Sequence, residues 1–147
     1  MSGAYAVALA EWRGAESELA SIRRTVFVVE QRVPEALEWD GLDAQCVHAV
    51  ARDERGGSIG TGRLTPEGRI GRMAVLAQWR SRGVGSALLA ALVNEARRRG
   101  MAAVNLHAQS RAIPFYERFG FSVHGDEFDE AGIPHREMHL DLTGDAS

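Results

Sequence analysis

The stretch Arg80-Ser81-Arg82-Gly83-Val84-Gly85-Ser86 joins a run of β-type residues to a long amphipathic segment. Gly83 and Gly85 carry no side chain that would keep an anion away from the backbone. The N–H groups that open the following helix lie at the positive end of its dipole, and Arg80 and Arg82 add charge. The stretch therefore predicts a phosphate-binding loop that fits a pyrophosphate. A structural alternative, in which the glycines only permit a tight turn, stays open at this point.

Two common phosphate-binding motifs do not match this stretch. All 17 basic residues are arginines, so the GxxxxGK[ST] motif is absent, and Leu88 stands at the third glycine of GxGxxG. The absence of lysine also excludes Schiff-base chemistry by this chain. Kinase, P-loop and dinucleotide-binding classes are therefore disfavoured.

Downstream of the loop, the residue pattern alternates between helix and strand. Val84, Leu88, Leu92 and Ala96 recur every four residues and predict a helix over 83–99, closed by Gly100. The next segments predict a buried strand over 102–106, a short helix over 111–119, and strands over 121–128 and 135–142 joined through 129–134.

Upstream of the loop, three β-type runs cover 46–52, 58–65 and 69–75 and are separated by turn-forming residues. They predict an antiparallel meander. Before it come a strand over 4–9, a helix between Gly14 and Pro34, and an ordered loop over 30–43. The strand, helix and strand between 69 and 106 require a parallel crossover, which predicts a mixed sheet and the α+β class.

Composition limits the class of protein. The chain has 147 residues, is 45% hydrophobic and carries a net charge of −3, which predicts one domain over 1–147 and disfavours nucleic acid as a partner. We found no membrane span and no secretory signal, so we expect a cytoplasmic protein. The single cysteine, Cys46, cannot form an internal disulfide and is expected in the core.

A second motif follows one strand after the loop, in Gln109-Ser110-Arg111-Ala112-Ile113-Pro114-Phe115-Tyr116-Glu117-Arg118-Phe119-Gly120-Phe121. The two stretches together resemble the GNAT superfamily of acyl-CoA-dependent N-acetyltransferases, with its patterns Q/RxxGxG/A and NxxAxxxYxxxGF. Gln109 stands where asparagine is usual and keeps the amide. The run 23–34, followed by Glu38 and Asp40, is similar to the small ElaA-like branch.

The resemblance implies a seven-stranded mixed sheet that splays between the strand ending at Val75 and the strand ending near His107, with acetyl-CoA in the gap. Backbone groups of Met73 to Val75 would bind its pantetheine, and an N–H there would polarise the thioester carbonyl. The implied cofactor-binding residues are Met73, Ala74, Val75, Arg80, Ser81, Arg82, Gly83, Val84, Gly85, Ser86, Gln109, Phe115 and Tyr116.

Three residues are candidates for proton transfer. By the resemblance, Tyr116 is the general acid that protonates the leaving thiolate; packing as a core aromatic is the alternative. Glu30 is the preferred base among the carboxylates Glu30, Glu38 and Asp40. For each of the three, ordinary solvation or an ion pair with an arginine is the more common role, and a water chain could replace the base. His107 could relay a proton or be structural.

The expected function is acetyl transfer from acetyl-CoA to a primary amine of an unidentified small molecule or peptide. The alternatives are a non-catalytic acyl-CoA-binding or sensor module and a structural dimerisation domain. A homodimer is expected from the family alone. We expect no metal cofactor, since His135 and His139 share a strand face but no metal-binding motif accompanies them.

Overall fold

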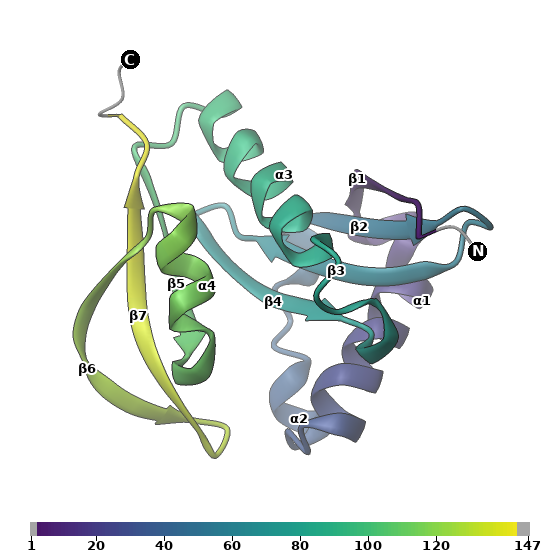
Figure 1. Cartoon of the computed structure of the whole chain (residues 1–147), viewed down its shortest axis with the longest axis horizontal. Helices are drawn as coiled ribbons and strands as arrows, with labels where there is room; N and C mark the ends of the chain where they lie inside the picture. The colour runs from purple at the N-terminus through teal and green to yellow at the C-terminus, as the bar shows by residue number, and fades with distance from the viewer. Residues whose placement is uncertain (1–2, 144–147) are drawn as a thin grey trace.

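One mixed sheet of seven strands runs through residues 3–143, the part of the chain that the computed structural model describes. Its order is β1-β2-β3-β4-β5-β7-β6, with a single parallel pair between β4 and β5 (Figure 1). This confirms the expected α+β class and the crossover. The strands are β1 (Tyr5–Glu11), β2 (Val47–Asp53), β3 (Ser58–Leu64), β4 (Arg69–Val75), β5 (Ala103–Gln109), β6 (Ser122–Glu130) and β7 (Ile133–Asp141).

Helices cover both faces of the sheet. In Figure 1, α3 and α4 lie in front of it and α1 lies behind. The helices are α1 (Trp12–Arg23), α2 (Glu35–Glu38), α3 (Val84–Arg98) and α4 (Ile113–Phe119). No helix within residues 3–143 is both long enough and apolar enough to cross a membrane.

Alternation along β2 explains how the two layers form. Ala49 and Ala51 pack with α3 residues such as Leu88 in the main core, whereas Val50 packs with Leu19 of α1 on the other face. All these side chains are fully buried. Since successive strand residues point to opposite faces, one apolar strand supports both helical layers.

The sheet splays where β4 meets β5. Only two residue pairs connect these strands, Arg69 with Asn105 and Ile70 with Leu106. Beyond these pairs β4 continues to Val75 and β5 continues to Gln109, but the two strands no longer pair with each other. The carboxyl halves of two neighbouring parallel strands thus leave a gap in the sheet, as the family resemblance implies.

A β-bulge lies in β4 at the start of this gap. Thr61 pairs with Ala74 and Arg63 with Gly71, so Arg72 and Met73 together face the single residue Gly62. Arg72 has a positive φ of 51°. A Cβ atom at Gly62 would lie 2.6 Å from the Met73 sulfur and 2.9 Å from Leu92 Cδ1, so a larger residue there would displace these side chains.

The structure differs from the sequence-based expectations in several segments. The loop expected over 30–43 contains the short helix α2, and the strand expected over 102–106 extends to Gln109 as β5. Residues after α1 continue as a π-helix, Arg24–Glu30, in place of one uninterrupted α-helix. Strands β6 and β7 leave only residues 131 and 132 between them, where a six-residue connection was expected. Glu130 therefore belongs to a strand and not to a loop.

Candidate active site

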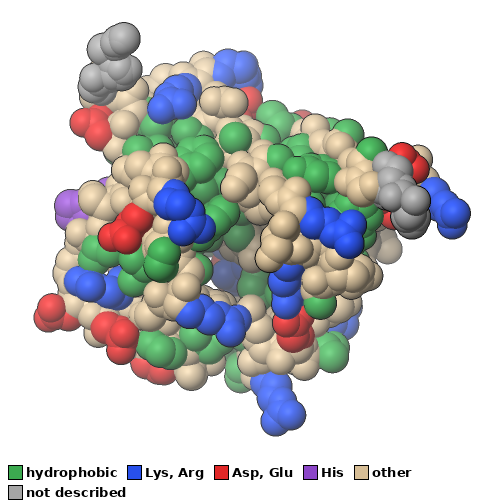
Figure 2. All heavy atoms as spheres, in the orientation of Figure 1, with side chains coloured by type: hydrophobic (Ala, Val, Ile, Leu, Met, Phe, Trp, Pro, Cys, Tyr) green, Lys and Arg blue, Asp and Glu red, His purple; other side chains and the backbone are tan. Residues whose placement is uncertain are grey.

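A cavity of about 680 Å³ occupies the gap between β4 and β5. Figure 2 shows the molecule hollowed on this face, with basic side chains around the opening. Charged and polar side chains lie on both sides of the cavity, together with apolar ones such as Phe27 and Met73. Its lining includes Phe27, Gln31, Glu38, Asp40, Arg63, Arg69, Arg72, Met73, His107, Gln109, Tyr116, Glu130 and His135.

The predicted phosphate loop opens α3 beside this gap. Gly83 is the N-cap residue, with a left-handed φ of 85°, and no side chain caps the helix. The first turn, which includes Val84, Gly85 and Ser86, therefore presents its N–H groups without an intrahelical acceptor. Ser81 also has a positive φ, and the Arg82 guanidinium lies 5.1 Å from the Trp79 ring centroid. This geometry fits an anion.

The two sequence motifs meet through an aromatic contact. A Cβ atom at Gly85 would lie 3.6 Å from the ring of Phe115, which belongs to α4. The Phe115 ring packs edge-on against Tyr116, with centroids 4.9 Å apart. The phosphate loop and the tyrosine motif are thus adjacent, although 30 residues of sequence separate Ser86 from Tyr116.

Tyr116 is a buried phenol that lines the cavity. Its side chain is in contact with Phe115 and Phe121, and none of residues 3–143 forms a hydrogen bond with its hydroxyl. Burial raises the pKa of Tyr116 to about 12. The group therefore stays protonated through the neutral range.

The backbone of β4 offers hydrogen-bonding groups to the gap. The Leu76 N–H donates to Ile59 of β3, so by strand alternation Ala74 also bonds to β3 while Met73 and Val75 face away from it. No β5 partner is present there. The Val75 N–H is therefore directed toward the gap, while the Val75 carbonyl accepts a hydrogen bond from Arg80 Nε at 2.9 Å.

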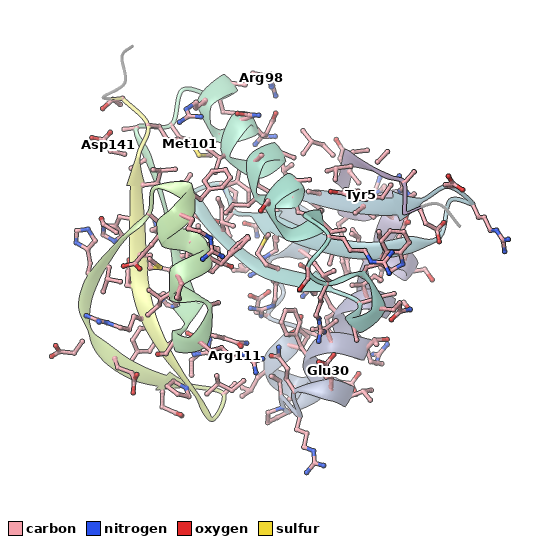
Figure 3. The ribbon with its side chains drawn as sticks, in the orientation of Figure 1. Tyr5, Glu30, Arg98, Met101, Arg111 and Asp141 are labelled. Atoms are coloured by element: carbon pink, nitrogen blue, oxygen red, sulfur yellow. The ribbon has the colours of Figure 1, made fainter. Side chains whose placement is uncertain are left out.

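Arg80 and Glu30 form an ion pair at the opening. Both terminal nitrogens of Arg80 lie 2.6 Å from the Glu30 carboxylate, and Arg80 Nε donates to the Val75 carbonyl at 2.9 Å. Figure 3 shows Glu30 and Arg111 on opposite sides of the gap. The hydrogen bonds from Arg80, together with the Arg111 charge, lower the pKa of Glu30. This pairing makes Glu30 a weaker base than a free carboxylate.

His107 lies on β5 within a polar chain. Its Nδ1 is 2.8 Å from Glu130 Oε1, and its Nε2 is 2.6 Å from Nη1 of Arg69. A neutral ring with the proton on Nδ1 satisfies both contacts, because Arg69 can only donate. Glu130 was not singled out from the sequence; the unexpected length of β6 brings it to the cavity.

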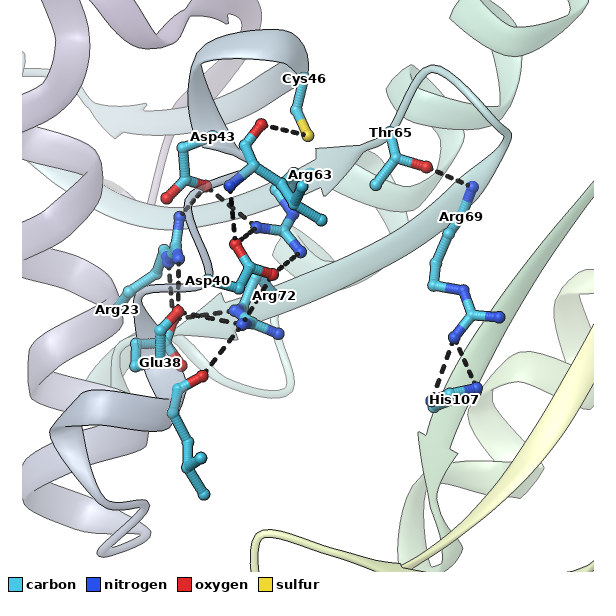
Figure 4. Close-up of polar contacts among 12 residues, drawn as sticks. Arg23, Glu38, Asp40, Asp43, Cys46, Arg63, Thr65, Arg69, Arg72 and His107 are labelled. Carbon is cyan, nitrogen blue, oxygen red and sulfur yellow. Dashed lines mark hydrogen bonds and ion pairs between the residues drawn. The ribbon is translucent and has the colours of Figure 1, made fainter.

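A network of three arginines and three carboxylates forms the opposite wall (Figure 4). Arg23, fully buried, donates to Glu38 and Asp43 at 2.7 Å each. The remaining contacts join Arg63 to Asp40 and Asp43, and Arg72 to Glu38 and Asp40. The network turns Glu38 and Asp40, two candidate bases, into ion-paired groups.

The remaining sequence-based candidates have structural partners. Gln109 donates from its side-chain amide to Gln31 at 2.9 Å across the cavity. Cys46 is buried, as expected, and its thiol lies 3.2 Å from the Leu42 carbonyl. Within residues 3–143 no three His, Cys, Asp or Glu side chains are grouped to hold a metal ion.

A mixed seven-stranded sheet that splays between β4 and β5, with α3 beginning beside the splay, is the fold of the GNAT acetyltransferase class. The model for the acetyltransferase (GNAT) domain matches residues 14–142. The chain belongs to this GNAT family.

Relatives and solved structures agree with this assignment. YjcF, an uncharacterized N-acetyltransferase of Bacillus subtilis, is 39% identical over 82% of this chain and 88% of its own. An acyl-CoA N-acyltransferase from Pseudomonas aeruginosa superposes with a TM-score of 0.82 at 27% identity, covering 93% of this chain and 99% of the other. For ElaA from Escherichia coli the TM-score is 0.83 at 25% identity, covering 92% and 99%.

Proposed function

We propose that this chain is an N-acetyltransferase that moves the acetyl group of acetyl-CoA directly to a primary amine of a small molecule or peptide. The observation that carries the proposal is the cavity between β4 and β5, because it brings the β4 backbone, Tyr116 and His107 to one space. The uncapped start of α3 supplies an anion site next to it.

The described residues fit the parts of acetyl-CoA. The N–H groups of Val84, Gly85 and Ser86 would hold the pyrophosphate, together with Arg80 and Arg82. Met73 and Val75 would pair with the pantetheine amides through their outward backbone groups. The thioester supplies an activated acetyl group, and an N–H at the β4 bulge would stabilise the oxyanion formed on attack.

The reaction requires two proton transfers. The amine nitrogen forms a bond with the thioester carbon, the carbon–sulfur bond breaks, and the sulfur takes its electron pair. Tyr116 donates its proton to that sulfur and regains one from solvent. Burial keeps the proton on the phenol at neutral pH, and the raised pKa makes Tyr116 a weaker acid than a free tyrosine, so the proton must move to the sulfur as the carbon–sulfur bond breaks.

His107 is the base that the geometry supports best. Glu130 accepts a hydrogen bond from the His107 Nδ1–H and orients the ring. Nε2 is then able to take a proton from the incoming ammonium once Arg69 releases its contact with that nitrogen. Glu30 remains a second candidate, but its carboxylate is bound to Arg80.

Calorimetric titration with CoA and amine-dependent release of free thiol from acetyl-CoA test the proposal. We expect both CoA binding and acetylated product. Binding without product from any amine would favour the alternative, a non-catalytic acyl-CoA-binding module. A folded protein that does not bind CoA would overturn the assignment altogether.

A further inference from the structure

The carboxylates that line the cavity differ in how they are neutralised. Glu38 pairs with Arg23 and Arg72, and Asp40 pairs with Arg63 and Arg72. Among the described residues of the lining, only Glu130 has no arginine partner; its contacts are with His107 and His135. On one wall of the cavity both carboxylates are therefore paired with arginines, whereas the carboxylate on the other wall has ion-pair contacts with histidines alone.

Arg72 keeps a donor that no described residue uses. Its Nη2 donates to the Glu38 carbonyl at 2.9 Å and to Asp40 at 3.2 Å, while Nε lies 3.1 Å from the Glu38 carboxylate. Nη1 forms no hydrogen bond within residues 3–143 and is not among the buried unpaired atoms, so it is accessible. Figure 4 shows this nitrogen without a dashed line, on the side away from Glu38.

The charge of Arg72 is also less compensated than that of its neighbour Arg63. Burial and the nearby charges of Arg63 and Arg23 lower the pKa of Arg72, despite the opposing effect of Glu38 and Asp40. For Arg63 the pairs with Asp40 and Asp43 outweigh burial and raise the pKa. An additional anion beside Arg72 would therefore be stabilised, whereas Arg63 has its partners already.

Arg72 and Glu130 lie on opposite sides of the gap, one in the β4 bulge and the other at the end of β6. We propose that the acceptor is an amine that also carries an oxyanion group, a carboxylate or a phosphate. The oxyanion binds Nη1 of Arg72, and the ammonium approaches from the side of Glu130 and His107. This inference rests on the proposed acetyltransferase function and names the substrate class of that site.

Matched pairs of amines test the inference, because each pair differs only in the anion. β-Alanine is compared with β-alaninamide, and ethanolamine phosphate with ethanolamine, by thiol release from acetyl-CoA. We expect kcat/KM to be about 10- to 100-fold higher for the anionic member, as one charge-assisted hydrogen bond provides. The pair with the larger ratio distinguishes carboxylate from phosphate.

Variants of Arg72 assign the preference to its side chain. In Arg72→Gln the ratio of kcat/KM for the anionic amine to kcat/KM for its neutral counterpart should fall to about one. Arg72→Lys keeps the charge without the planar fork and should give an intermediate ratio, which preserves the test if the glutamine variant does not fold. Arg55→Gln, in the exposed turn after β2, is the matched control and should leave the ratio unchanged.

Equal or lower kcat/KM for the anionic members in the wild-type protein would overturn the inference. If no amine is acetylated, the affinities of the two amines of each pair are compared by calorimetry, with and without CoA. Equal affinities would again overturn the inference. A protein that bound anionic amines preferentially but bound no CoA would contradict the proposed function, whereas a protein that bound CoA and acetylated both members of each pair equally would contradict the inference alone. The experiment therefore distinguishes failure of the inference from failure of the proposed function.

Discussion

A network of ion pairs joins the N-terminal third of the chain to β4, and a single ion pair joins it to the segment after β4; the two differ in burial. In the network around Arg23, the arginine and Glu38 side chains are 1% and 4% exposed. In the pair between Arg80 and Glu30, the side chains are 40% and 41% exposed. The first lies inside the wall of the cavity, whereas the second lies at its opening.

This difference indicates different roles for residues of the same type. A buried charge that loses its partner is costly, so the network fixes the position of α2 and of the β4 bulge. An exposed pair contributes little to stability and can exchange one partner for another. Arg80 can therefore leave Glu30 for a phosphate, while Arg23 has no comparable freedom.

The largest expected effect comes from breaking the buried network. Arg23→Ala leaves the carboxylates of Glu38 and Asp43 buried with fewer partners, and should lower the free energy of unfolding by about 3–5 kcal/mol. Denaturant titration measures it. Arg24→Ala is the matched control, because Arg24 also lies over Trp39 but its pair with Glu35 is half exposed; it should cost less than about 1 kcal/mol. Equal losses in both variants would contradict the comparison.

The next largest effect is expected at Tyr116, and it tests whether this buried tyrosine is the general acid. Tyr116→Phe keeps the ring against Phe115 and Phe121 but removes the proton donor. We expect kcat to fall about 10²-fold or more, with CoA affinity unchanged. Tyr5→Phe, at the other tyrosine of the chain, is the control and should keep its kcat. Full activity of Tyr116→Phe between pH 6 and 9 would remove Tyr116 from the mechanism.

Much of the fold is predictable because its signals are local. Gly56 and Gly57 mark one turn and Pro66 with Gly68 another, so the strands between them were located within one or two residues of their observed ends. The four-residue spacing in α3 is equally direct. The phosphate loop follows from the same kind of signal, since its glycines and arginines are adjacent in sequence.

The polar contacts of the site were not predictable, because they join residues far apart in sequence. Arg23 meets its carboxylate partners 15 and 20 residues later, and nothing in its neighbourhood distinguishes it from the exposed Arg24. Glu130 reaches the cavity because β6 extends through charged residues that lack a strand pattern. The pairing of Glu30 with Arg80 likewise spans 50 residues.

A smaller effect concerns acid stability of the network. Partial burial would raise the pKa of Asp40, but hydrogen bonds from Arg63 and the Leu42 N–H outweigh it and lower that pKa to about 2. A lowered carboxyl pKa stabilises the fold above the unfolded value near 4, and this stability is lost as pH falls toward 2. We expect at most about 2 kcal/mol of loss in that window, measured by denaturant titration at each pH. Asp40→Asn should flatten the profile, and the exposed Asp126→Asn should not; an unchanged profile in Asp40→Asn would rule out this residue as the source.

The smallest effect concerns the exposed pair, and it separates two roles for Glu30. If Glu30 only competes with phosphate for Arg80, Glu30→Gln frees the guanidinium and removes a nearby negative charge. CoA affinity should then rise by about two- to five-fold, in keeping with an exposed pair worth less than about 1 kcal/mol, while kcat and its pH profile stay unchanged. Glu35→Gln, in the exposed pair with Arg24, serves as the control.

The dependence on Arg80 completes this test. Arg80→Ala should weaken CoA binding by about 1 to 3 kcal/mol, and in that background Glu30→Gln should no longer tighten binding through the pair. If Glu30 is instead the general base, the single variant should lose kcat and shift its pH profile with CoA affinity unchanged. Calorimetry and pH-dependent kinetics on the wild-type protein, Glu30→Gln, Arg80→Ala and the double variant therefore distinguish a residue that controls cofactor affinity from one that takes the proton of the amine.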